Sequence, residues 1–300
     1  MSSDHVVRLG LIQHACPASA SKRQDLDKAC DMIRQAAGWG AQIVATQELF
    51  ATSYFPQVQE QARFDLAEPV PGPTTDRLCG LAKQLDIEIT ASLFEQRAAG
   101  VYHNTSVMIG AGGTIIGRYR KMHIPDDPRF YEKYYFTPGD PPGSGEDGGF
   151  GAHRTRHATT GMLVCWDQWF PEAARLTALR GAQILFYPTA IGWYHAETDA
   201  DRKQQLDAWR VIQRSHAIAN GVFVAAINRV GVEHDLTFWG SSFVCDPAGQ
   251  VIAAASGDQE QVLMAECDLG RIDQLRQSWP FLRDRRIDAY GGLCQRLIDP

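Results

Sequence analysis

Three residues of the sequence carry side chains that could together attack a carbonyl carbon. Cys165 follows the apolar run "GMLV", Glu48 follows the strand-like "IVATQ", and Lys121 follows the strand-like "IIGRYR". A thiol can act as the nucleophile, a carboxylate can take its proton, and an ammonium can stabilise the oxyanion that forms. The three residue types therefore supply the parts of one covalent mechanism.

Each of these residues also has an ordinary structural explanation. A free cysteine is usually a small buried hydrophobe, a single glutamate often caps a loop or a helix, and a lysine close to other basic residues is often solvated. The position of Cys165 between an expected strand and an expected helix predicts a thiol at the carboxyl edge of a sheet, where helix-start amides would lower its pKa. The joint placement of Cys165, Glu48 and Lys121 at strand ends favours catalysis.

Glu132 lies in the aromatic segment "FYEKYYFTPGD". We expect its carboxylate to orient Lys121 or to contact a substrate, and the alternative is a surface pair with Lys133. His153 and His157 are four residues apart, but no thiol or carboxylate stands at a spacing that would complete a metal site. No glycine-rich phosphate loop and no G-x-S-x-G motif is present. The sequence therefore predicts neither a metal nor a cofactor.

Apolar runs of strand length alternate with longer amphipathic stretches, which is typical of an α/β protein. The expected strands cover residues 6–13, 41–47, 87–96, 101–110, 112–121, 158–166, 182–189, 222–230 and 261–269, with a hairpin within 240–255. The expected helices cover 22–40, 73–86, 171–181, about 200–220 and a stretch after 269. Helical crossovers mixed with hairpins imply mixed sheets, and residues 137–150, rich in Pro and Gly, predict a surface loop. Residues 1–300 form one domain in this interpretation.

Composition excludes several classes of protein. The formal net charge is −6, and acidic and basic residues are interspersed without a basic stripe, so nucleic acid is not an expected partner. No apolar run reaches the roughly 20 residues needed to cross a bilayer, and the N-terminus lacks a secretory signal. The seven cysteines are scattered and form no C-x-x-C pair. We therefore expect a reduced, soluble, cytoplasmic protein without a membrane partner.

Three ordered blocks of the sequence resemble the catalytic blocks of the nitrilase superfamily of carbon–nitrogen hydrolases. These blocks are "QELF" with Glu48, "YRKMHIP" with Lys121 and "CWDQWFPEAAR" with Cys165, and the similarity extends to "FLRDRRIDAY" near the C-terminus. The resemblance implies a four-layer α-β-β-α sandwich and a second catalytic glutamate at Glu132. It also implies a homodimer or a higher homo-oligomer, with the tail of about 270–300 at the interface.

Within the superfamily, "CWDQWFPEAAR", "ILFYPTAIG" and "YEKYYFTPGD" are most similar to members that hydrolyse N-carbamoylputrescine to putrescine, carbon dioxide and ammonia, a step of polyamine biosynthesis. The alternatives are an aliphatic amidase, a β-ureidopropionase or a nitrilase with another small substrate. From a different class, a catalytically silent binding protein would keep the same fold. The segment "WYHAETDADRKQQLDAW" and the short loop "VEHDLT" depart from the family pattern, and we expect both to border the substrate pocket.

The expected mechanism follows from the roles of these residues. Glu48 accepts the Cys165 proton, and the thiolate attacks the carbamoyl carbon. The Lys121 ammonium and the backbone N–H of Trp166 hold the oxyanion. A thioester forms, and water activated by Glu48 releases it.

The distal amine of putrescine is a cation, so its pocket needs a carboxylate or an aromatic face. Tyr54, Glu197 and Asp199 are the candidate binding residues, chosen by their positions in expected loops.

Overall fold

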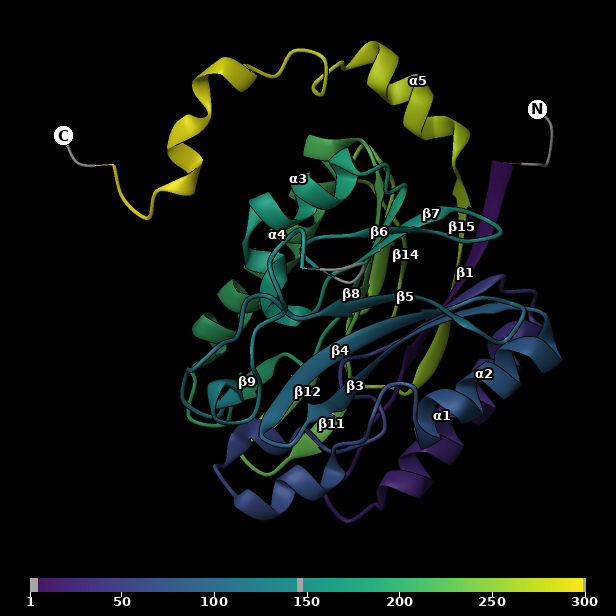
Figure 1. Ribbon diagram of the computed structural model, residues 1–300, viewed down its shortest axis with the longest axis vertical. Coiled ribbons are helices and arrows are strands. Elements are labelled where there is room, and N and C mark those ends of the chain that lie inside the picture. Colours follow the sequence, from purple (N-terminus) through teal and green to yellow (C-terminus); the bar gives the residue numbers. More distant parts are fainter. Residues whose placement is uncertain (1–4, 145–147, 299–300) are drawn as a thin grey trace.

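The strands of the protein form two large sheets that lie face to face, with helices on both outer sides (Figure 1). The structure is a computed structural model and describes residues 5–144 and 148–298. Its strands are β1 (Val6–Gln13), β2 (Ile43–Thr46), β3 (Glu88–Ala98), β4 (Val101–Ile109), β5 (Ile115–Arg120), β6 (Ala152–Arg154), β7 (Thr159–Met162), β8 (Ile184–Pro188), β9 (Gly192–Tyr194), β10 (Phe223–Ile227), β11 (Val230–Glu233), β12 (Leu236–Trp239), β13 (Phe243–Cys245), β14 (Val251–Ala254) and β15 (Gln261–Asp268). Its helices are α1 (Lys22–Gly38), α2 (Pro73–Leu85), α3 (Pro171–Leu179), α4 (Asp199–Asn220) and α5 (Gly270–Ser278).

Both large sheets are mixed, with parallel strands at the centre and antiparallel strands toward the edges. The first sheet has the order β15-β1-β2-β3-β4-β5, in which β1, β2 and β3 run parallel. The second has the order β14-β13-β10-β8-β7-β6, in which β7, β8 and β10 run parallel. Strands β11, β12 and β9 form a smaller antiparallel sheet. The expected α/β class with a four-layer α-β-β-α sandwich is confirmed.

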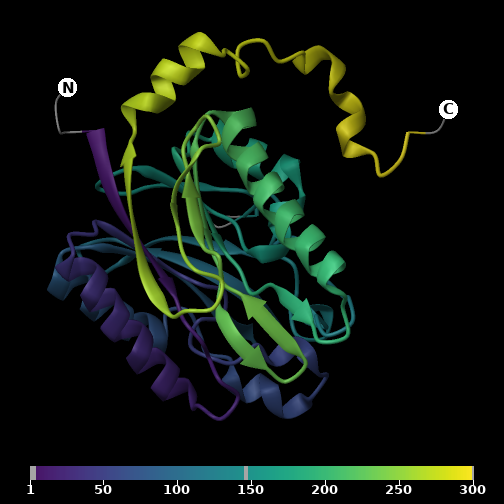
Figure 2. The same ribbon diagram turned by 180° about the vertical axis from the view of Figure 1, so that it is seen from behind.

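The helices bury apolar faces against the sheets. Helices α1 and α2 lie outside the first sheet, and α3 and α4 lie outside the second (Figures 1 and 2). Helix α1 starts at a capping box, in which the Ser21 N–H donates to Gln24 Oε1 (2.8 Å) and the Gln24 N–H donates to Ser21 Oγ (3.3 Å). Its Leu26 and Ile33 recur at helical spacing and join a buried cluster. Among the described residues, no helix is long and apolar enough to cross a membrane.

The strands that precede the candidate catalytic residues end on one side of the sandwich. Strands β2 and β3 are parallel, and the two antiparallel steps from β3 through β4 return β5 to the same direction. Glu48, just after β2, donates its backbone N–H to the carbonyl oxygen of Thr189, just after β8 (3.4 Å). The ends of the first and second sheets therefore touch, and residues distant in sequence meet there.

Three expectations about individual segments have different outcomes. The strand expected at 222–230 ends at Ile227, because the side chain of Asn228 turns to the backbone of Ile191 (Nδ2 to O, 2.9 Å). The segment "VEHDLT", expected as a short loop, belongs largely to the hairpin of β11 and β12, which pairs with β9. Residues 137–144 and 148–150 contain no helix or strand, as expected, and 145–147 lie outside the described residues.

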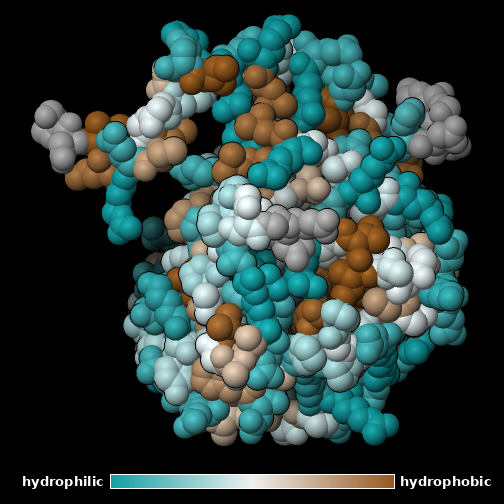
Figure 3. All heavy atoms as spheres, viewed as in Figure 1, coloured by the Kyte–Doolittle hydropathy of each residue, from teal (hydrophilic) through white to brown (hydrophobic). Residues whose placement is uncertain are grey.

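The chain ends in an arm, here defined as residues 279–298, that runs away from the sandwich (Figures 1 and 2). It contains two short 3₁₀ turns, Ile287–Ala289 and Gly291–Cys294. Large aromatic and aliphatic side chains are exposed along it, and brown, hydrophobic atoms are visible on the arm in Figure 3. The exposed side chains are those of Trp279, Phe281, Ile287, Tyr290, Leu293, Leu297 and Ile298. Such a concentration of exposed apolar residues is typical of a surface that another chain covers.

The packing of α3 on β7 depends on a missing side chain at Gly161. A Cβ there would contact Thr177 Cγ2 and lie 2.9 Å from Leu185 Cδ2. Thr177 cannot easily turn aside, because its hydroxyl donates to the Ala173 carbonyl (2.9 Å). We expect Gly161→Ala to lower the free energy of unfolding by about 1–3 kcal/mol in urea titrations.

The matched control is Gly80→Ala in α2, where the added Cβ meets nothing within 4 Å. This change is expected to raise the free energy of unfolding by about 0.5–1 kcal/mol, because alanine is the better helix former. Equal stability of the two variants would contradict the packing described for β7.

Candidate active site

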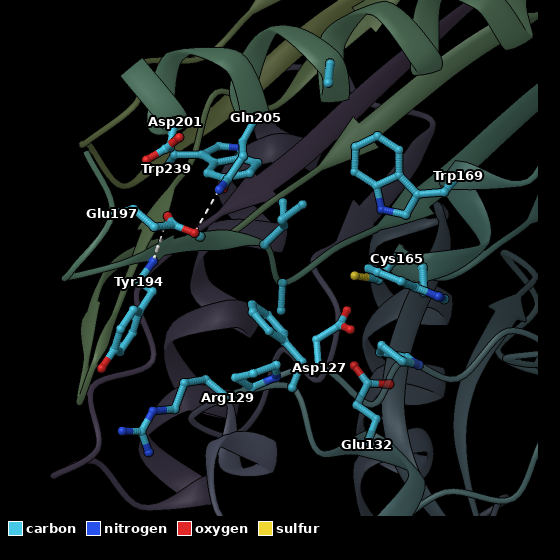
Figure 4. A pocket seen from close by; sticks show the side chains of 18 of the residues that line it. Asp127, Arg129, Glu132, Cys165, Trp169, Tyr194, Glu197, Asp201, Gln205 and Trp239 are labelled. Carbon is cyan, nitrogen blue, oxygen red and sulfur yellow. Dashed lines mark hydrogen bonds between the residues drawn. The ribbon is translucent and has the colours of Figure 1, made fainter. Parts of the chain in front are cut away.

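A cavity of about 910 Å³ opens at the strand ends. Cys165, Glu132 and Trp166 line it, and aromatic rings form much of the remaining wall (Figure 4). Ligands in open α/β folds bind at the carboxyl ends of parallel strands, and this cavity occupies that position. It is therefore the candidate site.

Lys121 is the centre of the polar group at the base of the cavity. Its side chain is fully buried, and its Nζ lies 2.8 Å from Glu48 Oε1 and 2.6 Å from Glu132 Oε2. Asn104 of β4 donates from Nδ2 to the same Glu48 oxygen (2.7 Å). An ammonium has three N–H donors, so two serve the carboxylates and one is left for a substrate.

Burial and charge act in opposite directions on this group. Burial disfavours the charged form of Lys121, but Glu132 and Glu48 outweigh it and raise the lysine pKa. Burial also raises the pKa of Glu132 to about 7, although Lys121 opposes that rise. Lys121 therefore stays an ammonium at neutral pH, while Glu132 stands near its titration point.

Tyr54 is buried and hydrogen-bonds to Glu132, one of the two carboxylates that contact Lys121. Its hydroxyl donates to Glu132 Oε1 (2.7 Å), and its backbone N–H donates to Glu233 Oε2. The side chain is buried and lies outside the residues that line the cavity. The expectation that Tyr54 contacts the substrate cation is therefore corrected, because its polar end is already engaged by Glu132.

Arg229 holds the backbone of the glutamate that follows β2. Its Nη2 donates to the carbonyl oxygens of Glu48 (2.7 Å) and Leu49 (3.1 Å), and its Nη1 pairs with Glu233 Oε1 (2.8 Å). Leu49 has a φ of 49°, which is unfavourable for a leucine. The buried Arg229–Glu233 pair therefore links the second sheet to a strained turn that fixes Glu48.

Cys165 occupies a tight turn rather than the first residue of a helix. It has a φ of 43° and begins a 3₁₀ turn, Cys165–Trp169, and α3 starts only at Pro171. Burial raises the pKa of the thiol, and the charge of Glu48 raises it further. The expectation that helix-start amides lower this pKa is thus wrong, because burial and a neighbouring carboxylate dominate.

The free oxygen of Glu48 suits the proton of this thiol. Glu48 Oε1 accepts from Lys121 and Asn104, whereas Oε2 is buried without a hydrogen-bond partner among the described residues. The backbone N–H of Ala190 hydrogen-bonds to the Cys165 sulfur. Glu48 raises the pKa of the Cys165 thiol through its charge and keeps one carboxylate oxygen unoccupied, so it can act as the base during attack.

Two polar residues of the same turn fix its shape. Asp167 Oδ2 accepts from the Tyr119 hydroxyl (2.7 Å) and from the Val164 N–H (2.9 Å). Gln168 Oε1 accepts from Trp209 Nε1 of α4 (2.8 Å). The Cys165 turn is therefore tied both to β5, which precedes Lys121, and to the helix outside the second sheet.

The remaining predicted binding residues divide between the cavity and the surface. Trp166 and Glu197 line the cavity, as expected. Asp199 is fully exposed at the start of α4 and lies outside the lining residues, whereas Asp201 lines the cavity. The expectation for Asp199 is corrected, because two residues further along a helix point to a different side.

Acidic and aromatic side chains dominate the cavity wall. The lining carboxylates are those of Asp127, Glu132, Glu197 and Asp201. Figure 4 shows the Asp127 side chain directed into the cavity. Aromatic lining residues include Phe130, Tyr131, Trp166, Trp169, Tyr194 and Trp239. This wall suits a small substrate with a cationic end.

Sequence reasoning missed several residues that the site uses. Asn104 is a polar residue within an apolar strand pattern, and Asp167 follows Cys165 by two residues. Arg229 follows the apolar run "VFVAAI" by two residues, after Asn228. A charged or amide side chain in such a position is rarely buried without a partner, and that signal could have identified all three. Among the described residues, no group of three or more His, Cys, Asp or Glu residues could hold a metal ion.

Sequence comparison agrees with this geometry. A family model described as carbon–nitrogen hydrolase matches residues 8–277. This chain belongs to the carbon–nitrogen hydrolase family. The resemblance to the nitrilase superfamily is confirmed, and the protein is a hydrolase that acts on carbon–nitrogen bonds other than peptide bonds.

Two relatives have names that denote similar hydrolytic activities. This hydrolase is 43% identical over 296 residues to an N-carbamoylputrescine amidase from Solanum lycopersicum, covering 96% of this chain and 94% of that protein. It is 40% identical over 281 residues to a citrullinase from Francisella tularensis, covering 92% of this chain and 94% of that protein.

Solved structures of the family superpose on nearly the whole chain. A carbon–nitrogen hydrolase from Helicobacter pylori G27 has 44% identity and a TM-score of 0.91, covering 98% of this chain and 99% of that one. A glutamate-to-glutamine variant of an amidase from Nesterenkonia sp. AN1 has 26% identity and a TM-score of 0.75, covering 96% of both chains. That amidase carries the acetamide moiety of fluoroacetamide covalently on its active-site cysteine.

The Tyr54 hydroxyl is expected to set the pH range in which Glu132 is ionised. Its hydrogen bond lowers the pKa of Glu132. Tyr54→Phe removes that bond, so the pKa of Glu132 rises and a larger fraction is protonated at neutral pH. We expect the acidic limb of the kcat/KM profile to move to higher pH, with roughly tenfold lower activity at neutral pH and recovery at alkaline pH.

The matched control for this measurement is Tyr135→Phe. Tyr135 is a buried tyrosine of the same aromatic cluster, and its hydroxyl donates to the Val58 carbonyl rather than to Glu132. The acidic limb of the kcat/KM profile of Tyr135→Phe is expected to stay at the wild-type pH. A loss in Tyr54→Phe that is equal at every pH would contradict the role given to its hydroxyl.

Proposed function

We propose that the protein is an N-carbamoylputrescine amidohydrolase that releases putrescine, carbon dioxide and ammonia. The observation that carries this proposal is the acidic, aromatic cavity that opens on Cys165. A cationic diamine derivative complements such a wall, and the Solanum lycopersicum relative bears that activity by name. The reaction takes place in polyamine biosynthesis in this proposal.

The first half of the reaction forms a thioester. Glu48 Oε2 accepts the Cys165 proton as the sulfur attacks the carbamoyl carbon. The third N–H of Lys121 and the backbone N–H of Trp166 stabilise the oxyanion, and one such donor contributes about 3–4 kcal/mol to lowering the barrier. The tetrahedral intermediate then expels an amine, which takes the proton back from Glu48.

The second half regenerates the thiol. Water enters as the departing amine leaves, and Glu48 Oε2 takes its proton while the oxygen attacks the thioester carbonyl. Lys121 again stabilises the oxyanion, and Cys165 leaves with the proton from Glu48. The carbamic acid formed in this step loses carbon dioxide and so frees the second amine, which completes the release of putrescine, carbon dioxide and ammonia. Glu132 acts on Lys121 throughout, since it holds the ammonium from the side opposite Glu48.

We assign the distal ammonium of the substrate to Glu197. Gln205 Nε2 donates to its Oε1 (2.7 Å), and the Tyr194 N–H donates to its Oε2 (3.1 Å), so the carboxylate is fixed in the wall of the cavity (Figure 4). Both of these partners are neutral, and no salt bridge reaches Glu197 from the rest of the described chain. Its charge is therefore available to a ligand.

A second candidate is hydrolysis of L-citrulline. The relative from Francisella tularensis is named a citrullinase, and the Arg129 side chain lines the cavity. An α-amino acid substrate brings a carboxylate that an arginine could bind. The excess of carboxylates over arginine in the wall favours the diamine derivative.

The proposal is tested by following ammonia release from a panel of substrates. The panel contains N-carbamoylputrescine, L-citrulline, N-carbamoyl-β-alanine, n-butylurea, a short aliphatic amide and a short nitrile. We expect preference for N-carbamoylputrescine, and Glu197→Gln is expected to raise its KM about tenfold with a much smaller change in kcat. The control Asp199→Asn changes a carboxylate two residues after Glu197, at the start of α4 and outside the cavity.

Each outcome of the panel has a defined meaning. Preference for another member of the panel would overturn the proposed substrate and leave a hydrolase of different specificity. No activity on any member would favour a catalytically silent binding protein of the same fold. An unchanged KM in Glu197→Gln would remove Glu197 from the binding of the ammonium.

We propose further that residues 1–300 form one hydrolase domain that acts in the cytoplasm as a homodimer or a higher homo-oligomer. All seven cysteines are free thiols, which suits a reducing compartment. The tail, about 270–300, lies at the interface in this proposal. The exposed apolar side chains of the arm support it, because they have no core of their own chain to enter.

Removal of residues 279–300 is expected to convert the oligomer to a smaller species in light scattering coupled to size-exclusion chromatography. The control replaces only Arg283 and Asp284, an exposed ion pair of the arm, by alanine. Exposed pairs contribute little to stability, so that variant is expected to keep the full assembly. An unchanged mass after truncation would contradict the proposed interface.

A further inference from the structure

Arg129 is the one cationic side chain among the described residues that line the cavity. It lies with Tyr194 toward the end of the cavity that is remote from Cys165 (Figure 4). Its guanidinium stands 5.7 Å from the centre of the Tyr194 ring. A substrate held by its carbamoyl group at Cys165 would direct its far end toward this region.

The positive charge of Arg129 is compensated from outside the cavity. Its Nη2 lies 2.7 Å from Asp235 Oδ2, and Asp235 does not belong to the lining residues. Asp235 sits in the turn between β11 and β12, where its carbonyl oxygen accepts from the His195 N–H (3.1 Å). His195 Nδ1 is 3.8 Å from the other carboxylate oxygen, Oδ1.

The segment that presents Arg129 is also held in place. Arg129 has a φ of 70°, and the turn around it is closed by the Phe130 N–H, which donates to the Asp127 carbonyl (2.8 Å). Phe130 packs against Tyr54 with ring centres 5.6 Å apart. The guanidinium therefore meets Asp235 from a fixed backbone rather than from a free loop.

The two candidate substrates differ in one group at their far end. L-citrulline has the same ureido group and carbon chain as N-carbamoylputrescine, with one added carboxylate on the carbon that carries the amine. An arginine without a carboxylate partner at that end would attract the added carboxylate of L-citrulline. If the arginine is already neutralised by a protein carboxylate, the other carboxylates of the cavity wall repel the carboxylate of L-citrulline. Discrimination between L-citrulline and N-carbamoylputrescine therefore depends on whether the charge of Arg129 is neutralised.

We propose that Asp235 is a specificity-determining residue that neutralises Arg129 and so selects substrates with a distal ammonium and no distal carboxylate. This inference rests on the proposed function, since it assumes a ureido substrate whose far end reaches Arg129. Asp235 acts through Arg129 and touches no substrate. It lies in the turn of the hairpin formed by β11 and β12.

The test compares kcat/KM for L-citrulline, N-carbamoylputrescine and uncharged n-butylurea in the full-length protein. Asp235→Asn keeps the shape of the side chain and removes its charge, so the ratio of citrulline to N-carbamoylputrescine is expected to rise about five- to tenfold. Arg129→Gln is expected to lower the same ratio, and the double variant is expected to lose the rise. Added salt is expected to reduce the effect, because both groups are partly exposed.

The matched control is Asp86→Asn, which removes a carboxylate from another exposed Arg–Asp pair of the same length, 2.7 Å, between Arg156 and Asp86. It is expected to leave all three substrates in their wild-type ratios. Thermal melting of each variant separates loss of folding from a change in preference.

Two outcomes distinguish this inference from the proposed function. An Asp235→Asn variant that melts like the control and keeps the wild-type ratio of citrulline to n-butylurea would overturn the role of Asp235. A wild-type protein that turns over N-carbamoylputrescine no faster than n-butylurea would overturn the proposed function. Even if the proposed function is overturned in this way, the ratio of kcat/KM for L-citrulline to that for n-butylurea in Asp235→Asn still tests the role of Asp235.

Discussion

The ammonium of Lys121 stands between two carboxylates that share a site from which water is excluded. Glu48 and Glu132 would repel each other strongly there, and each alone would carry a large cost of desolvation. Lys121 contacts both at 2.8 and 2.6 Å, and Asn104 and Tyr54 satisfy further oxygens. The fold has to deliver all of these groups together, because any one left without the others would be a buried unpaired charge.

That constraint explains why the site is built where the two sheets meet. Glu48 and Lys121 follow strands of the first sheet, and Cys165 follows a strand of the second. Arg229, which stands between β10 of the second sheet and β11 of the small sheet, reaches the carbonyl oxygens of Glu48 and Leu49. Residues of the first sheet thus hold the side chain of Glu48, and Arg229 holds its backbone. A shift of either sheet would change the distance between base and thiol.

The same electrostatics decide how the nucleophile is generated. Burial and the charge of Glu48 keep the Cys165 thiol protonated, in contrast to the cysteines that helix termini activate. In the proposed mechanism, the unpartnered oxygen of Glu48 receives the proton only as the carbon–sulfur bond forms. Glu197 and Arg129, to which we assign substrate specificity, line the cavity wall away from this buried group, so substrate preference can vary without disturbing it.

Local sequence patterns located most of the strands, although those expected at 158–166 and 222–230 end earlier, at Met162 and Ile227. They left an ordinary structural explanation open for Glu48, Lys121 and Cys165, and the resemblance of three ordered blocks singled these residues out. Local patterns could not give the direction of a side chain at a helix start, which is why Asp199 was chosen in place of Asp201. They also could not reveal contacts between distant segments. Arg229 touches residues about 180 positions earlier in the chain, and that proximity is created only by the packing of two sheets. Tyr54 was misjudged for the same reason, since Glu132 lies 78 positions away.

Transfer of the Cys165 proton to Glu48 is tested most directly in a single turnover with N-carbamoylputrescine, followed by intact-protein mass spectrometry and peptide mapping. The account predicts a transient covalent adduct on Cys165 in the wild-type protein. It predicts much slower adduct formation in Glu48→Gln and none in Cys165→Ala. An adduct that maps to another cysteine, equal rates in wild type and Glu48→Gln, or full turnover by Cys165→Ala would contradict it.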